Sequence, residues 1–133
     1  MAKKIILNPD WPRAGRAGFA MGTRIGDTVY VAGQVAQDPD GNVVGEGDMT
    51  AQSRCVFANI EAVLKEAGAT MDDVVKITTY VTDMDRYADF DAVRREVFPK
   101  AGMASATVAC TRMVKPECLV EVETVAVIGS AGE

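Results

Sequence analysis

Histidine is absent from this chain of 133 residues. Its absence excludes Ser-His-Asp and Cys-His nucleophile systems, a histidine general base and every zinc site that mixes cysteine with histidine. Cysteine is also scarce, because Cys55, Cys110 and Cys118 are widely spaced and form no C-x-x-C pair. We therefore expect reduced, buried thiols. Any chemistry must come from other side chains, and we expect no metal ion and no cofactor.

The sequence also lacks a long apolar run and an excess of positive charge. No segment approaches the roughly 18–20 apolar residues that a membrane-spanning helix needs, and the apolar stretch at residues 5–7 is too short for the core of a signal peptide. Lys and Arg number 14 against 19 Asp and Glu, a net charge of -5, which opposes binding to phosphate backbones. We expect a cytoplasmic protein without membrane or nucleic-acid partners.

The composition is that of one folded domain. Hydrophobic residues make up 48% and charged residues 25% of the chain, as in ordinary globular proteins. No repeat, low-complexity tract or linker divides it, so residues 1–133 are expected to form a single domain with one core.

Periodicity and turn residues predict the order β-β-β-α-β-α-β-β. A helix should begin at Asp48 or Thr50 and end at Gly68, and a second should span residues 87–98 and end at Pro99. Extended segments are expected just before Asn8 and over residues 20–25, 28–33, 74–81, 104–112 and 119–128. This order predicts an α+β fold in which two helices cover one face of a mixed sheet.

The last strand is apolar on both faces. Val120, Val122, Ala126 and Ile128 point one way, while Leu119, Val125 and Val127 point the other. The two helices cover only one face. We therefore expect another copy of the same subunit to cover the second face in a cyclic oligomer.

Two carboxylates, Glu121 and Glu123, lie on that second face, where a purely apolar core strand would not carry them. Two interpretations are open. In the first, both are solvated residues or partners of lysines. In the second, an interface between subunits covers the face, burial raises the pKa of a carboxylate, and that group holds a water molecule or moves a proton.

The fifth expected strand offers weak support for a site. Its hydroxyls, including Ser105 and Thr107, share one face and would form a polar pocket beside the carboxylates, although β-propensity alone explains any one of them. Cys110 is expected in the core, since no histidine exists to activate it. Arg24 and Lys76 are candidate cations for a carboxylate substrate, or simply surface charges.

Four segments of the chain resemble the Rid family, also called YjgF or L-PSP. They are Ala32-Gly33-Gln34-Val35 and the stretches over residues 59–68, 74–84 and 120–127. The resemblance covers essentially the whole chain. It implies a chorismate mutase-like fold, a homotrimer with a central barrel, and ligand clefts between subunits.

The resemblance also implies site residues. Glu121 matches the glutamate associated with the hydrolytic water, and the backbone of Gly33 lines the cleft. Phe19 stands where the family has a tyrosine, Thr107 where it has a cysteine, and Ser105 where RidA-type members have the arginine that binds the substrate carboxylate. A buried Arg-carboxylate pair that loses one partner costs about 2–5 kcal/mol, so we expect weak turnover of 2-imino acids unless another cation is present.

These observations favour a small-molecule hydrolase or deaminase that acts on an enamine, imine or related C-N intermediate, with Glu121 activating water. The alternative is a non-catalytic protein of the same fold that binds a ligand or protects other proteins. A third possibility, endoribonuclease activity, follows from the L-PSP name and is opposed by the negative net charge and the absence of histidine.

Overall fold

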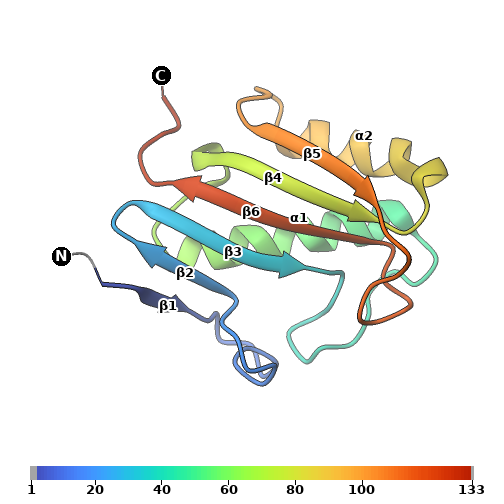
Figure 1. The fold of residues 1–133 in the computed structure, drawn as a ribbon, viewed down its shortest axis with the longest axis horizontal. Helices are drawn as coiled ribbons and strands as arrows, with labels where there is room; N and C mark the ends of the chain where they lie inside the picture. The colour runs from blue at the N-terminus through green and yellow to red at the C-terminus, as the bar shows by residue number, and fades with distance from the viewer. Residues whose placement is uncertain (1–2, 133) are drawn as a thin grey trace.

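The computed structural model describes residues 3–132 and contains one mixed sheet of six strands, in the order β1-β2-β3-β6-β4-β5. Both long helices lie on the same face of this sheet (Figure 1). The predicted α+β class and element order are confirmed. The elements are β1 (Ile5–Leu7), β2 (Gly22–Ile25), β3 (Thr28–Gln34), α1 (Met49–Glu66), β4 (Val74–Val81), α2 (Tyr87–Val97), β5 (Ala104–Ala109) and β6 (Val120–Val127), with short 3-10 turns η1 (Met71–Asp73) and η2 (Met84–Arg86).

Local signals position helix α1 as the sequence indicates. The Asp48 carboxylate accepts a hydrogen bond from the Ala51 amide at 3.0 Å and so caps the first turn. Val56, Ile60 and Val63 are fully buried against the sheet. At the other end, Gly68 has a φ of +76°, the left-handed conformation that ends a helix most readily at glycine.

Helix α2 packs on α1 through aromatic contacts. The ring centroids of Phe57 on α1 and Phe90 on α2 lie 5.7 Å apart, and Phe98 meets Phe57 edge-on at 5.6 Å. This packing keeps α2 over the β4 and β5 end of the sheet, as Figure 1 shows.

The last strand of the chain, β6, occupies a central position in the sheet. Strands β4 and β5 are parallel and are joined through α2, which places β5 at the sheet edge. Strand β6 then inserts between β3 and β4, antiparallel to both. Strand β5 ends at Ala109, three residues earlier than predicted, because β4, the strand with which it pairs, ends at Val81.

The two faces of β6 differ as predicted. Val120, Val122 and Ala126 are buried beneath the helices, while Val125 and Val127 are only half-buried on the open face. The open face carries further apolar side chains on neighbouring strands, among them Ile25, Tyr30 and Val108.

The three cysteines are free thiols, but only Cys118 is buried. The expectation of burial is wrong for the other two, which are half-buried. Cys110 lies just after the end of β5, so the alternation of that strand does not direct its side chain into the core. The Cys55 thiol lies 3.5 Å from the carbonyl of Gln37, a residue of the loop after β3. Among the described residues, no helix is long and apolar enough to cross a membrane.

Candidate active site

Glu121 lies directly over the backbone of Gly33. The register between β3 and β6 shifts between Val31 and Gln34, so the chain around Gly33 departs from regular pairing. A methyl group at Gly33 would fall 2.0 Å from Oε2 and 2.9 Å from Cδ of Glu121. Glycine at this position is therefore what allows the carboxylate its place, which explains why the two residues belong to one site.

The two carboxylates of β6 are in different surroundings. Glu121 is half-buried, and this burial, reinforced by the nearby charge of Glu123, raises the pKa of its carboxyl above the ordinary value. Glu123 is exposed and accepts a hydrogen bond from the Tyr80 hydroxyl at 2.7 Å. The same bond raises the pKa of Tyr80. The solvated interpretation thus describes Glu123, while Glu121 has the surroundings of a proton acceptor.

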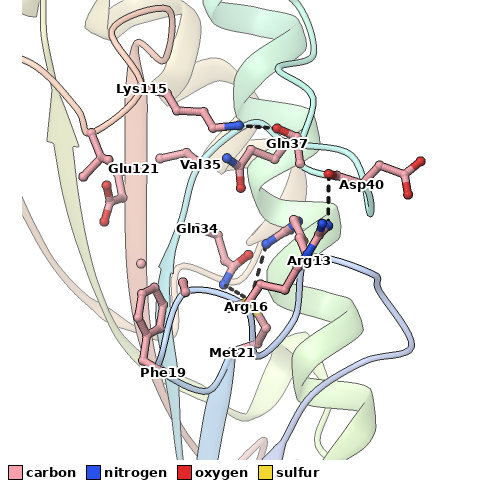
Figure 2. Close-up of a pocket in the computed structure, with 14 residues that line it drawn as sticks. Arg13, Arg16, Phe19, Met21, Gln34, Val35, Gln37, Asp40, Lys115 and Glu121 are labelled. Atoms are coloured by element: carbon pink, nitrogen blue, oxygen red, sulfur yellow. Dashed lines mark hydrogen bonds between the residues drawn. The ribbon is translucent and has the colours of Figure 1, made fainter.

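Glu121 forms one wall of a cavity of about 540 Å³ (Figure 2). This volume is in the range of small-molecule sites. The other walls come from the loop between β1 and β2, the end of β3, the turn over residues 38–42 and the loop before β6. The cavity is lined by Arg13, Arg16, Ala17, Phe19, Met21, Gly33, Gln34, Val35, Gln37, Asp40, Gly41, Val114, Lys115 and Glu121. The structure therefore places Phe19, Gly33 and Glu121 on the walls of one cavity.

Arg13 is a half-buried cation of this cavity. Its guanidinium lies 4.3 Å from the centre of the Trp11 ring, and its Nε donates to the Asp38 carbonyl at 2.9 Å. One terminal nitrogen contacts the Met21 sulfur at 3.4 Å, while the other, Nη2, is buried without a hydrogen-bond partner. Burial lowers the pKa of the group, although an arginine so placed remains charged.

Ser105 and Thr107 do not join this cavity. They pair with Ile77 and Thr79 of β4, whose side chains face the helices, whereas Glu121 pairs with Tyr80 on the open face. The expectation of hydroxyls beside the carboxylates is therefore wrong within one subunit. Strand β4 separates β5 from β6. The alternation along each strand is as predicted, but it does not determine which face of the sheet the hydroxyls and the carboxylates occupy.

Three cations of the cavity, Arg13, Arg16 and Lys115, were not singled out from the sequence. The cations considered there have other places: Arg24 donates to the Ala67 carbonyl at 2.9 Å at the end of α1, and Lys76 lines a separate cavity of about 260 Å³ on the open face. The one signal for Arg13 and Arg16 was their position in the loop that leads to Phe19. Lys115 gave none.

The fold and site define a class of small α+β proteins in which two helices back a mixed sheet and a glutamate lies over the backbone of a glycine on the wall of a cavity. Residues 12–128 match the family model described as Endoribonuclease L-PSP. The chain belongs to this family, which is also called the YjgF or Rid family.

Individual relatives agree with this assignment. A RutC family protein of Pyrococcus abyssi is 34% identical over 126 residues, which are 95% of this chain and 98% of the relative. A YjgF/YER057c/UK114 family member from Mycobacterium tuberculosis is 31% identical with a TM-score of 0.83, over 95% of this chain and 100% of the other. A Rid family protein of unknown function from Yersinia pestis is 29% identical with a TM-score of 0.86, over 95% and 100% of the two chains.

Proposed function

We propose that this protein is a hydrolase of small molecules that contain a C=N bond, such as an imine or the imine tautomer of an enamine. The observation that carries the proposal is the Glu121 carboxylate, held over Gly33 on the wall of a ligand-sized cavity with a raised pKa. The resemblance to deaminases of the Rid family supports the same reaction class.

The chemistry requires one proton acceptor and one water molecule. The substrate reacts as its iminium form, in which the nitrogen already carries a proton. Glu121 takes a proton from water as the oxygen attacks the iminium carbon, and the product is a neutral carbinolamine. The carboxylic acid form of Glu121 then returns its proton to the nitrogen, and the C-N bond breaks. Ammonia or an amine leaves, and the hydroxyl proton passes to the Glu121 carboxylate as the carbonyl forms, from which it is released to solvent. A raised pKa suits this cycle, because the group must both accept and donate the proton.

A homotrimer would complete the site in this proposal. The open face exposes apolar residues such as Tyr30 and Val108, which are 50% and 45% accessible, and a neighbouring subunit is the simplest cover for them. Strand β5 is an exposed sheet edge, so a neighbouring copy would carry Ser105 and Thr107 toward the cleft that Glu121 lines. This arrangement reconciles their expected role with their distance from Glu121 within one subunit.

The test is Glu121→Gln, which preserves the size of the side chain but cannot accept the proton of water. We expect the hydrolysis rate to fall by about 10²-fold or more, the usual contribution of a general base. Glu123→Gln is the matched control, because it removes the same charge two residues along on the same strand. The assay follows carbonyl product from a panel of imines formed in solution.

The outcome separates the alternatives. An unchanged rate in Glu121→Gln would remove the hydrolase assignment and favour the non-catalytic binding protein. Cleavage of RNA that survives repurification and disappears in Glu121→Gln would instead favour the endoribonuclease activity that the family description names.

A further inference from the structure

The turn over residues 38–42 organises all three cations of the cavity through its backbone. The carbonyl of Asp38 accepts from Arg13 Nε at 2.9 Å, and the carbonyl of Asp40 accepts from Arg16 Nη2 at 3.4 Å. The carbonyl of Gly41 accepts from Lys115 Nζ. Three backbone carbonyls of one turn thus orient three positive side chains toward one end of the cavity.

Backbone carbonyls orient these cations without cancelling their charge. The ion pairs within residues 3–132 involve other cations, so none of the three is paired with a carboxylate there. The Asp38 carboxylate accepts from the amides of Asp40 and Asn42 at 3.0 and 2.9 Å, which stabilises the turn and lowers the pKa of that carboxyl. Asp40 is exposed, and Figure 2 shows its carboxylate directed away from Glu121.

Two buried polar atoms of the cavity walls lack partners. Arg13 Nη2 is a free donor, and Gln34 Oε1 is a free acceptor on a side chain that is only 2% exposed. The Gln34 amide nitrogen is already used by the Ala32 carbonyl at 3.1 Å. Buried polar atoms are rarely left unpaired in proteins. Arg13 Nη2 can therefore donate to an anionic ligand, while Gln34 Oε1 can accept from a donor group of the ligand or from water.

We propose that the end of the cavity formed by Arg13, Arg16 and Lys115 binds an anionic group of the substrate, a carboxylate or a phosphate. Positive side chains that keep their charge in a partly enclosed cavity are the groups that bind oxyanions through charge-assisted hydrogen bonds. Their concentration here contrasts with the net charge of -5 of the whole chain.

The position of this anion subsite refines the substrate class, and that step rests on the proposed role of Glu121. Figure 2 shows Glu121 on one side of the cavity and Arg13 and Arg16 on the opposite side. If the C=N carbon lies at Glu121, the anionic group must be separated from it across the cavity. The substrate is then an extended imine with a remote acidic group, not a short 2-imino acid whose carboxylate adjoins the reacting carbon.

Anion binding can be measured without turnover. The chain has a single tryptophan, Trp11, and the Arg13 guanidinium lies over its ring. We would titrate the protein with inorganic phosphate, and separately with succinate, at constant ionic strength and follow tryptophan fluorescence. Saturable binding of either probe is expected, and the tighter probe identifies the acidic group.

The variants are Arg16→Gln and Lys115→Gln, with Lys65→Gln as the matched control. Lys65 is an exposed cation near the end of α1 and lies outside the cavity. Each cavity variant should raise the Kd of the tighter probe by roughly tenfold or more, as for loss of a charge-assisted hydrogen bond, and the control should stay within about twofold. Circular dichroism verifies the fold, and Arg13 is left intact because its stacking on Trp11 supports the loop.

Two results would overturn the proposal: no saturable binding of either probe, or equal weakening in Lys65→Gln, which would show only the effect of overall charge. Glu121→Gln separates this proposal from the hydrolase assignment. It should lower turnover by about 10²-fold or more yet retain or tighten anion binding, because it removes a negative charge from the cavity. Turnover that does not depend on Glu121, with anion binding intact, would refute the reaction while leaving the subsite in place.

Discussion

The substitution Gly33→Ala tests the site at its closest contact. The added methyl group would lie 2.0 Å from Glu121 Oε2, 2.9 Å from Cδ and 3.2 Å from Cγ. Carbon and oxygen atoms that are not bonded stay more than 3 Å apart, so the carboxylate must move by about 1 Å or more. A displacement of this size costs roughly 10²-fold in rate when the group must be aligned with the reacting atoms.

The same substitution should leave the fold intact. The methyl group meets the end of a flexible side chain, and no backbone atom is among its three closest contacts. Gly33 does not have a positive φ, so alanine reduces the entropy of the unfolded chain and stabilises by about 0.4–1 kcal/mol. Strain in the displaced Glu121 rotamer costs about 0.5–1.5 kcal/mol. The free energy of unfolding should therefore change by no more than about 1 kcal/mol.

The control is Gly102→Ala, because a methyl group there meets no atom within 4 Å and the residue has no positive φ. Hydrolysis of the imine panel and chemical denaturation would be measured for both variants. Titration of the Glu121 carboxyl carbon by NMR gives a readout that needs no substrate, and its raised pKa should fall in Gly33→Ala as the group moves toward water. A wild-type rate together with an unchanged Glu121 pKa would refute the steric argument.

Three other predictions concern charge, assembly and specificity. The ratio kcat/KM should rise with pH through the pKa of Glu121, because the base must be ionised, and that pKa lies above its ordinary value. Glu123→Gln removes the neighbouring negative charge that contributes to the raised pKa, so it should move the rise in kcat/KM to lower pH. Light scattering should report about 43 kDa, three times the 14.2 kDa chain, and a stable monomer would contradict the shared cleft. Ser105→Arg should raise turnover of iminopyruvate by tenfold or more if β5 of a neighbouring subunit reaches the cleft, and an unchanged rate would place Ser105 outside it.

Sequence alone was sufficient where the controlling interactions are local. The cap at Asp48, the apolar spacing of α1 and the stop at Gly68 lie within one segment, so they predict both ends of the helix to within two residues. The alternation in β6 likewise places Glu121 on the face opposite the helices. Gly33 and Glu121 came from the family resemblance, and the structure adds the reason that they belong together.

Tertiary structure decided which strands adjoin and which charges gather. Alternation along β5 places Ser105 and the residues next to it on opposite faces of the strand. It does not show that β4 lies between β5 and β6. The cation cluster depends on contacts from Arg13, Arg16 and Lys115 to carbonyls that are 25, 24 and 74 residues away in the chain. A backbone carbonyl is the same in every residue, so its role as an acceptor leaves no trace in the sequence and is set only when folding brings the segments together.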